Sequence, residues 1–558
     1  MHMRNVGMLL VLGSAAAVAP RPPPGSVYAI PPERRTVWKP GIPDGIPARD
    51  TVCATVEAAT YGNGSEDATG GIRAALEACP PGQVVALSAG TFMVTSTLVI
   101  NKGIVLRGQG PKETLLKSNG FNGAVVWLGP LWPHVGTSVK LTANVAKGAT
   151  SVSVAGAKGL APGMLVLIDE LWDPSYVQWS ATRSPPGNPS RGWFSRMDRP
   201  VGQMVEVASV SGNTVTFTTP LHIAFDVAHD AQLSTWDVPA TRNAGLEDLH
   251  VYGGGNHNIV LALAAYSWVE NVESEWSTGD SIGLNASFRC VVRDSYFHHS
   301  PKLHPGGGAY GLSLSLSSAD NLIENNIFWH FNKVMVMRAS GGGNVVGYNY
   351  FDDGFIGTTP KDYTQWMEVG MNASHMTCPH YELFEGNEAF NIDADNTWGN
   401  SVYVTFFRNH ATGKRRSFPD VDNRRAIGLM AGSWWYTFVG NVLGYPGMSP
   451  RPHQGFRFEG KPPWGPPVPM WQLGYNPENW KQKADPRVLS TTIREGNYDY
   501  ATGEVHWSSG PRPLPDSLYL SGKPAFFGND PWPWVDPLGT VKLHKLPARV
   551  RFDAMNNP

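Results

Sequence analysis

The chain has 558 residues, of which 42% are hydrophobic and only 16% are charged. This composition excludes a disordered chain, and the formal net charge of -2 provides no global basic field for nucleic acid or an anionic membrane. The 61 glycines, 46 prolines and 20 tryptophans favour a turn-rich β protein over a helical one.

The N-terminus has the pattern of a secretory signal peptide over residues 1–19. Arg4 precedes an apolar run that begins near Met8, and small residues follow up to Ala19. We therefore expect a secreted protein, either extracellular or periplasmic. Residues 20–50 are rich in proline and are expected to form an extended leader on the surface. No other apolar run is long enough to span a bilayer, so we expect no membrane partner.

Residues 51–130 predict an N-terminal cap followed by the first strands. Asp67–Cys79 begins with residues that cap helices and has apolar residues three to four positions apart, which predicts a short amphipathic helix. Cys53 and Cys79 bracket this segment and would be oxidised outside the cytosol, so we expect them to form a disulfide.

The residues after this helix resemble the first coil of the pectate lyase-like superfamily. In that superfamily a capping helix is followed by Pro-Gly, an apolar strand and Ala-Gly-Thr-Phe; the corresponding residues are Pro81-Gly82, Gln83–Leu87 and Ala89-Gly90-Thr91-Phe92. The resemblance implies a right-handed parallel β-helix and a polysaccharide partner. It covers about sixty residues and selects no family within the superfamily.

Two regions are predicted to depart from a regular coil. Residues 131–235 contain short alternating strands with Gly-Asn turns, which predict a small β insertion whose centre, Trp172–Arg199, is a long exposed loop able to lie over a groove. Residues 446–558 are rich in Pro, Trp and Gly without helix-like stretches. We expect them to form a last coil and a strap that covers the open end of the β-helix, with a separate binding module as the alternative.

Residues 236–445 repeat in strand-turn units. Asparagine recurs at one place in the unit, at Asn326, Asn349, Asn387, Asn409 and Asn441. Steps of 23 and 22 residues match one solenoid coil, and steps of 38 and 32 residues indicate coils with inserted loops. A coil cannot bury its apolar face alone, so we expect stacked coils to form the core and the asparagines to form an internal hydrogen-bonding ladder.

One column of strands is expected to border a long cleft that fits an extended polymer. The predicted strands of this column are Ser281–Leu284, Tyr310–Leu314, Val334–Arg338, Met367–Met371, Val402–Thr405 and Ala426–Leu429. The loops that precede these strands carry many Asp, His and Trp residues, which we expect to line up along the cleft.

The candidate catalytic residues are the carboxylates Asp352, Asp353, Glu368, Asp393 and Asp395. Hydrolysis of a glycosidic bond needs one carboxyl group to protonate the leaving oxygen and a second to activate water or attack carbon. Asp is also common in turns for backbone reasons alone. No cofactor is required for hydrolysis, although the Asp352/Asp353 and Asp393/Asp395 pairs offer oxygen ligands for Ca²⁺.

A further carboxylate, Asp280, follows Thr278-Gly279 at the place where polygalacturonase-like members of the superfamily carry their first catalytic Asp. Their adjacent Asp pair is missing from the next coil, which has Gly306-Gly307-Gly308 instead. This departure argues against polygalacturonase activity.

The candidate substrate-binding residues are aromatic, imidazole and basic side chains on the same loops and strands. Indole rings stack on sugar faces, imidazoles transfer protons, and cations neutralise a uronic acid carboxylate. The candidates are Trp329, His330, Arg338, Trp366, His375, Trp398, His299 and Lys333. The spacing of histidines and cysteines fits no common metal motif, so we predict no metal ligands.

Three functions are compatible with these patterns. We favour a glycoside hydrolase for an extracellular polysaccharide, because carboxylates alternate with Trp and the chain is not strongly basic. A lyase or epimerase for a uronic acid polymer is the alternative, favoured by the superfamily resemblance and by the Lys and Arg groups. A non-catalytic, glycan-binding β-helix is the third. We expect a polysaccharide partner, no nucleic acid and a monomeric protein.

Overall fold

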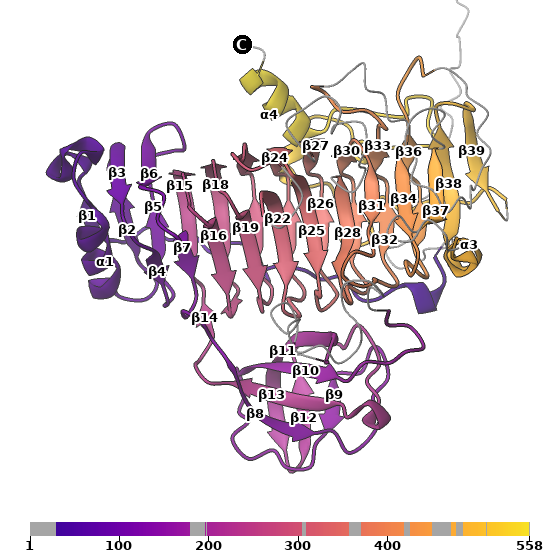
Figure 1. The fold of residues 1–558 in the computed structure, drawn as a ribbon, viewed down its shortest axis with the longest axis horizontal. Coiled ribbons are helices and arrows are strands. Elements are labelled where there is room, and N and C mark those ends of the chain that lie inside the picture. The colour runs from indigo at the N-terminus through magenta and orange to yellow at the C-terminus, as the bar shows by residue number, and fades with distance from the viewer. Residues whose placement is uncertain are drawn as a thin grey trace, which may run out of the picture.

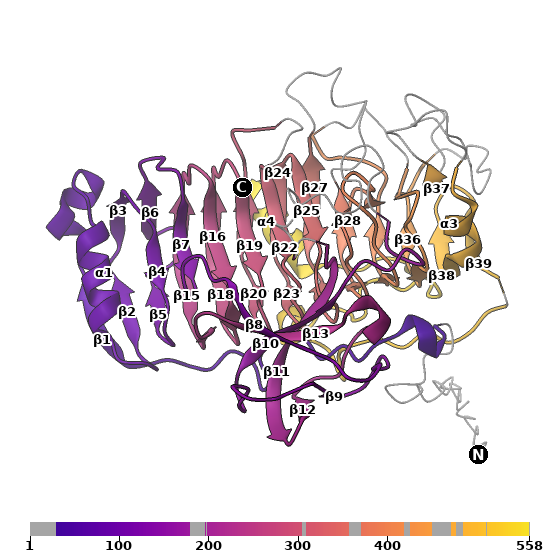
Figure 2. The same cartoon turned by 60° about the horizontal axis from the view of Figure 1, so that its bottom comes forward.

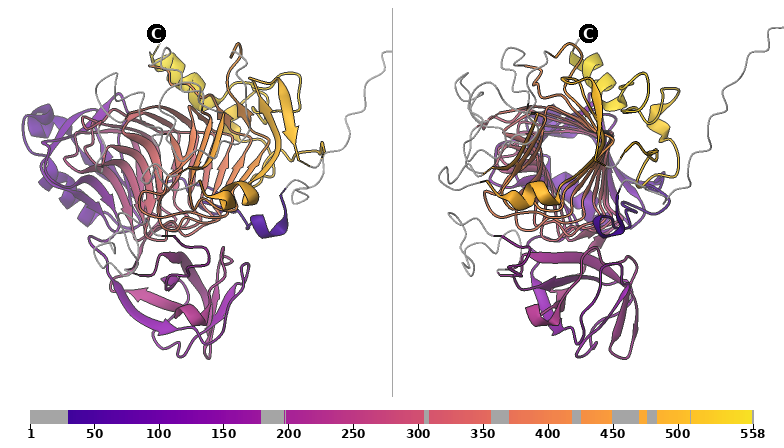
Figure 3. Two further views of the ribbon diagram at one scale, coloured as in Figure 1. Left: turned by 45° about the vertical axis from the view of Figure 1, so that its right-hand side comes forward. Right: turned by 90° about the vertical axis from the view of Figure 1, so that its right-hand side faces the viewer.

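The computed structural model describes residues 30–178, 196, 198–303, 308–355, 370–417, 425–448, 470–475, 484–508 and 510–556. Most of them form a coil of parallel strands whose successive turns lie side by side along the long axis (Figure 1). Viewed along that axis, the strands surround a common interior (Figure 3). The predicted parallel β-helix is therefore confirmed, whereas the predicted signal peptide lies outside the described residues.

The strands stack in three columns, and the coils between the two ends contribute to all three. The first column contains β1 (Val52–Val56), β2 (Val84–Leu87), β5 (Val105–Arg107), β15 (Gly245–Tyr252), β18 (Trp268–Glu275), β20 (Val291–Arg293), β23 (Leu322–Glu324), β26 (Val345–Gly347), β29 (Leu383–Glu385), β32 (Thr405–Phe407), β35 (Thr437–Val439) and β38 (Ile493–Asp499). The second contains β3 (Gly90–Val94), β6 (Thr114–Ser118), β21 (Tyr296–His298), β24 (Ile327–Phe331), β27 (Tyr350–Gly354), β30 (Glu388–Ala389), β33 (His410–Ala411) and β36 (Val442–Leu443), together with the C-terminal parts of β15, β18 and β38.

The third column forms a separate sheet. It contains β4 (Leu98–Ile100), β7 (Ala124–Leu128), β16 (His257–Ala262), β19 (Asp280–Asn285), β22 (Tyr310–Ser315), β25 (Lys333–Arg338), β28 (Met371–Met376), β31 (Ile392–Ala394), β34 (Ile427–Met430) and β37 (Trp471–Tyr475). The short β14 (Thr241–Arg242) and β17 (Ala264–Ala265) pair beside it.

The core fills the interior of the coil with side chains that repeat from one coil to the next. Phe384 stacks on Phe406 with ring centroids 4.6 Å apart, and Phe406 stacks on Phe438 at 5.1 Å. Stacked rings of this kind add specific contacts to the burial of apolar area. The regular pairing thus comes from alternate apolar residues that occupy equivalent places in successive coils.

The predicted asparagine ladder is confirmed. The Nδ2 atom of Asn349 donates to Oδ1 of Asn387 at 3.0 Å, and Nδ2 of Asn387 donates to Oδ1 of Asn409 at 2.9 Å. Asn326 and Asn441 occupy the same position in their coils and continue the ladder in both directions. Every rung is buried, so the turn between the first and second columns has a fixed register.

The N-terminal end of the coil is closed by helix α1 (Thr69–Ala78), within the predicted segment. Asp67 accepts a hydrogen bond from the backbone nitrogen of Thr69 at 2.9 Å, which satisfies a free amide of the first turn. Ile72 and Leu76 face the core. Cys53 and Cys79 form the expected disulfide, with Cα atoms 5.6 Å apart, and so tie β1 to the end of the helix.

An antiparallel sheet leaves the coil between β7 and β14 and projects from one side of it (Figures 1 and 2). Its strands are β8 (Val135–Lys140), β9 (Ser151–Ser153), β10 (Leu165–Glu170), β11 (Val201–Ser211), β12 (Thr214–Phe217) and β13 (Gln232–Trp236). Leu167 and Met204 pack against Phe288 of the coil, which attaches the insertion through an apolar contact.

Both ends of the described chain lie along the outside of the coil. Ile30 and Trp38 of the leader are buried against the outer side of the first column, so this leader is packed rather than simply exposed. In the C-terminal segment Leu514 packs on the first column, and Phe552 packs on the second, where it contacts Tyr350 with ring centroids 4.9 Å apart. The prediction that residues 446–558 lack helices is wrong, because α3 (Pro486–Thr491) and α4 (Pro547–Asn556) form there.

Sequence reasoning missed these helices because each begins with Pro at its first position. Proline is typical of turns, although its fixed φ also suits the start of a helix. Asp485 caps α3 by accepting from the backbone nitrogen of Arg487 at 2.9 Å. The remaining short elements are β39 (Glu504–Trp507) and the 3-10 turns Pro32–Arg34, Ala58–Gly64, Val227–His229 and Ala525–Phe527. None of the helices in the described ranges combines the length and apolar character needed to cross a membrane.

A second polar ladder ends in a buried acid and gives a prediction about pH. Asn321 donates to Asn344 at 2.8 Å, and Asn344 donates to Glu382 at 3.1 Å. Burial raises the pKa of Glu382 to about 8, against the hydrogen bonds that it accepts. The carboxyl group of Glu382 therefore binds its proton more tightly in the folded state than in the unfolded state. Its contribution to stability is lost as pH rises from the pKa of the unfolded state to the folded-state pKa of about 8.

We expect Glu382→Gln to be more stable than the wild type above pH 8, by on the order of 3 kcal/mol, because it keeps the neutral form. Below the unfolded pKa of a glutamic acid the two proteins should have similar stability. Urea unfolding at several pH values measures the difference. A constant difference across the pH range would show that Glu382 does not titrate as described.

Candidate active site

The outer side of the third column presents a row of polar side chains. The predicted strands in Ser281–Leu284, Tyr310–Leu314, Val334–Arg338 and Ala426–Leu429 correspond to β19, β22, β25 and β34. Residues 367–369 lie outside the described chain, and β28 begins only at Met371. The assignment of Val402–Thr405 to this column is wrong: β31 takes that place, and Thr405 begins β32 of the first column. Asp393 interrupts the apolar pattern of β31, whereas the Val-Tyr-Val-Thr run is more regular and therefore predicts a strand.

His375 and Asp395 form the centre of this polar row. The Nδ1 atom of His375 lies 2.8 Å from Oδ2 of Asp395, and Nδ2 of Asn372 donates to the same oxygen at 2.6 Å. Burial lowers the pKa of His375, which favours the neutral ring, although Asp395 opposes the change. Burial acts to raise the pKa of Asp395, but His375 and Lys333 outweigh it and hold that pKa well below its usual range. A neutral imidazole thus donates from Nδ1 to a carboxylate and leaves Nε2 as an acceptor.

Tyr310 faces the other nitrogen of this imidazole. Its hydroxyl oxygen lies 3.4 Å from Nε2 of His375. The three residues therefore form a continuous path from a hydroxyl to an imidazole to a carboxylate, supplied by β22, β28 and the end of β31. Tyr310 and His375 are only 4% and 5% exposed, so their proton exchange is shielded from bulk water.

Two cations flank this path. The Arg338 guanidinium lies over the Tyr310 ring, 4.8 Å from its centroid, and donates to Oδ1 of Asp280 at 3.2 Å. Its Nε is buried and has no hydrogen-bond partner among the described residues. Lys333 Nζ lies 3.8 Å from Asp395 Oδ2. The cluster of Tyr310, Lys333, Arg338, His375 and Asp395, named the central cluster below, thus offers positive charge beside a proton-transfer pair.

Asp393 lies on the same face as the central cluster but is held in an ion pair. Arg425 Nη2 donates to Oδ1 of Asp393 at 2.9 Å, and both side chains are buried. Arg425 also donates to Tyr475 at 2.6 Å. Burial raises the pKa of Asp393 to about 7, against the attraction of Arg425. Asp393 and Asp395 therefore have environments that move their pKa values in opposite directions.

Several predicted site residues lie in the second column instead. Strand β27 continues through Asp352 and Asp353. It pairs with β24, which carries Trp329 and His330. The indole of Trp329 donates to Asp353 Oδ2 at 2.6 Å. The prediction that all acidic bends line one cleft is therefore wrong for this pair. Asp was interpreted as a loop residue, whereas the strand extends past it.

The other predicted residues have these places. His299 follows β21 in the second column and contacts His330, with ring centroids 4.6 Å apart. Trp398 is half-buried and bridges to Met376 at the end of β28. Glu368 and Trp366 lie outside the described residues.

A cavity of about 260 Å³ lies beside Asp352 in the second column. Burial, followed by the charge of Asp353, raises the pKa of Asp352 to about 7, and Tyr350 donates to it at 2.7 Å. Glu388 shares the cavity; burial acts to raise its pKa, but His410 and Arg549 outweigh it and lower the pKa. This cavity is a second place where two carboxylates have pKa values shifted apart.

Of the two predicted pairs of calcium ligands, Asp393 and Asp395 are directed at nitrogen donors, whereas the Asp352/Asp353 pair stays a prediction. Asp395 is bound to His375, Asn372 and Lys333, and Asp393 is bound to Arg425. Ca²⁺ needs several oxygen ligands that converge on one point, and these carboxylates are directed at nitrogen donors.

Sequence reasoning missed Tyr310, Asn372 and Glu388. Tyr310 lies in a predicted strand of the correct column, but it alternates in step with Leu312 and Leu314, which face the core, so the pattern gives no signal for its contact with His375. Asn372 carries no signal in the sequence. Glu388 directly follows the ladder residue Asn387, so the repeat itself places it at the start of a second-column strand.

Comparison with known proteins bears on the fold. No family model and no curated protein matches the chain. The tailspike gp61 of Pseudomonas phage phi297 is 14% identical, with a TM-score of 0.51 over 69% of this chain and 59% of that one. The Gp54 tailspike of Acinetobacter baumannii bacteriophage AP22, solved with a capsular saccharide, is 12% identical, with a TM-score of 0.45 over 72% and 60%. The tailspike gp49 of Pseudomonas phage LKA1 is 15% identical, with a TM-score of 0.42 over 71% and 60%.

The chain thus spans about 60% of the length of these tailspikes. The likeness to gp61 shows the parallel β-helix fold, in agreement with the fold that the resemblance in the sequence implies. These tailspikes are too distant to carry an activity across.

Proposed function

We propose that the protein is a secreted enzyme that binds an extracellular uronic acid polymer along the third column and cleaves it by β-elimination. The observation that carries this proposal is the path Tyr310–His375–Asp395 with Arg338 and Lys333 beside it. Elimination needs a base, a proton donor and a cation near the uronate carboxylate, and the central cluster contains all three.

The proposed step balances within the central cluster. Nε2 of His375 removes the proton at C5 of the uronate, the C4–O bond breaks, and a C4–C5 double bond forms. The Tyr310 hydroxyl protonates the leaving oxygen and then recovers a proton from His375. Arg338 neutralises the carboxylate as negative charge develops at C5, and Asp395 keeps the imidazole in the required tautomer.

Hydrolysis remains a second candidate because of the cavity at Asp352. A protonated Asp352 and an ionised Glu388 match the acid and base of a glycoside hydrolase. The two proposals use different columns and give different products, so one experiment separates them.

The test is an assay of the full chain on a panel of polymers. We expect uronic acid polymers, such as alginate, polygalacturonate and glucuronan, to yield products with the ultraviolet absorbance of an unsaturated uronate. Neutral glucans should give no reaction. New reducing ends without that absorbance would show that the reaction is hydrolysis and not elimination. In that case we would expect the Asp352→Asn variant to be inactive. Binding without either signal would reject both reactions and leave a glycan-binding protein.

A further inference from the structure

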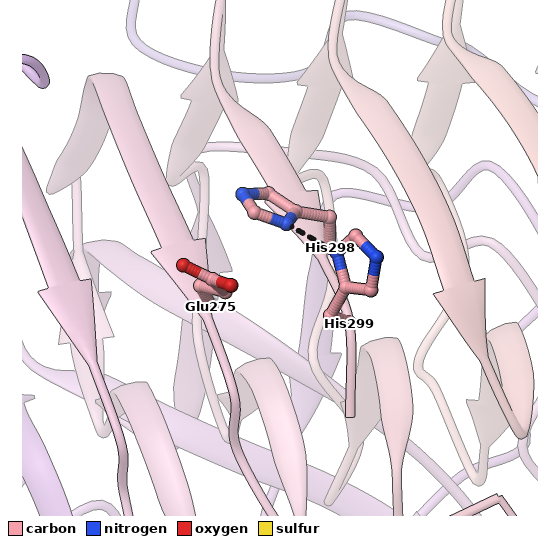
Figure 4. A group of neighbouring side chains, drawn as sticks. All are labelled: Glu275, His298 and His299. Carbon is pink, nitrogen blue, oxygen red and sulfur yellow. Dashed lines mark hydrogen bonds between the residues drawn. The ribbon is translucent and has the colours of Figure 1, made fainter. Parts of the chain in front are cut away.

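A group of histidine and glutamate side chains lies on the outer side of the second column, away from the central cluster. Glu275 ends β18, His298 ends β21 and His299 follows it (Figure 4). One potential ligand atom from each of the three lies within 4.8 Å of the others. A second set, His250, Glu273 and Glu275, meets the same condition and shares Glu275 with the first.

The contacts within this group leave coordinating atoms available. Nε2 of His250 is buried and has no hydrogen-bond partner among the described residues, although Oε2 of Glu275 lies 3.6 Å away. His298 and His299 face each other through their Nδ1 atoms at 2.7 Å, so a single proton separates two nitrogen lone pairs. A divalent cation that replaced this proton would receive both nitrogens, and Glu275 lies close enough to complete the set.

The local chemistry favours a transition metal over Ca²⁺ or Mg²⁺, because imidazole nitrogen outnumbers oxygen in the first set. Each imidazole binds a metal ion through the lone pair of a neutral ring, so binding of the ion is expected to weaken as pH falls. Lys112 binds Glu273 at 2.7 Å and His298 Nε2 lies 3.2 Å from the same carboxyl group, which makes Glu273 an outer partner that orients His298.

We propose that Glu275, His298 and His299 bind a zinc-class divalent cation, with His250 able to supply a further nitrogen through the shared Glu275. Tetrahedral Zn²⁺ with bonds of about 2.1 Å places its ligand atoms roughly 3.4 Å apart. The Nδ1 atoms of His298 and His299, now 2.7 Å apart, therefore move apart on binding, and Glu275 adjusts to the same spacing. Glu275 and His299 are only partly buried and allow this movement. The ion joins β15, β18 and β21 in adjacent coils and leaves the central cluster untouched.

The test measures binding of Zn²⁺ alone to the full chain by isothermal titration calorimetry, with the metal removed beforehand by a chelator. We expect one site for each chain, and an increase in the midpoint of thermal unfolding on adding Zn²⁺. Glu275→Gln and His299→Asn should each weaken binding by at least about 100-fold, and His506→Asn, on β39, should bind as the wild type does.

Circular dichroism shows whether each variant is folded. Two different variants are used so that one unfolded variant does not decide the result. Equal binding by Glu275→Gln, His299→Asn and the wild type would overturn the proposal, and so would the absence of Zn²⁺ binding by the wild type. The result is independent of whether the central cluster performs elimination.

Discussion

His375→Asn is expected to lower kcat for the elimination reaction by about 10²–10⁴-fold, because it removes the base and keeps the fold. The asparagine amide retains a donor for Asp395, so the carboxylate does not lose its partner. KM should change little, since Arg338 still meets the substrate carboxylate. The measurement is the initial rate of ultraviolet absorbance on the preferred polymer.

Tyr310→Phe should cause a loss of similar size, and the double variant should lose little more than either single one. Groups that act as one proton-transfer unit are not additive. His134→Asn, which changes an exposed histidine of the insertion, is the matched control. If His375→Asn kept full activity, His375 would not be the base, and the proposed mechanism in the central cluster would be wrong.

The same path predicts the acid side of the pH profile. Burial lowers the pKa of His375, so its neutral, basic form persists below the pH at which an ordinary histidine becomes protonated. We expect kcat/KM to fall only at a pH below that ordinary value. A fall at a clearly higher pH would assign the base to another group.

The parts of the fold that sequence reasoning predicted depend on local pattern. Asp67 and the apolar spacing after it identify α1, and the recurring asparagines identify the ladder, because each signal lies within one coil or repeats between coils. The C-terminal helices were missed because a proline such as Pro486 or Pro547 fits both a turn and a helix start. The cap by Asp485 accompanies α3, and the packing of Phe552 on the coil accompanies α4.

The site was predicted less completely for a geometric reason. His375, Asp395, Lys333 and Arg338 were chosen by residue type, and the register of the three coils that contain β25, β28 and β31 brings them together. Asp353 was chosen on the same basis, yet an extension of β27 by two residues places it in another column. Loop lengths vary between coils, so the sequence does not define which column a polar residue joins.

The largest effect on stability is expected at the middle of the asparagine ladder. Oδ1 of Asn387 accepts from both the backbone nitrogen and the Nδ2 atom of Asn349, and its own Nδ2 donates to Val346 and Asn409. Asn387→Ala removes the acceptor of the buried backbone amide of Asn349 and the side-chain donor to the carbonyl oxygen of Val346. Each unsatisfied group costs about 1–3 kcal/mol, so the free energy of unfolding should fall by on the order of 3 kcal/mol.

Asn387→Asp distinguishes the ladder from simple packing, because it has nearly the same size. Aspartate keeps the acceptor for Asn349 but loses the donor to Val346 and Asn409, and it places a carboxyl group where Asn387 has no exposure. We expect it to be at least as destabilising as alanine, as measured by urea unfolding at pH 7. Asn119→Ala, at an exposed turn, should change the free energy by less than about 0.5 kcal/mol. If Asn387→Asp kept the stability of the wild type, hydrogen bonding along the ladder would not be what fixes the register of the coils.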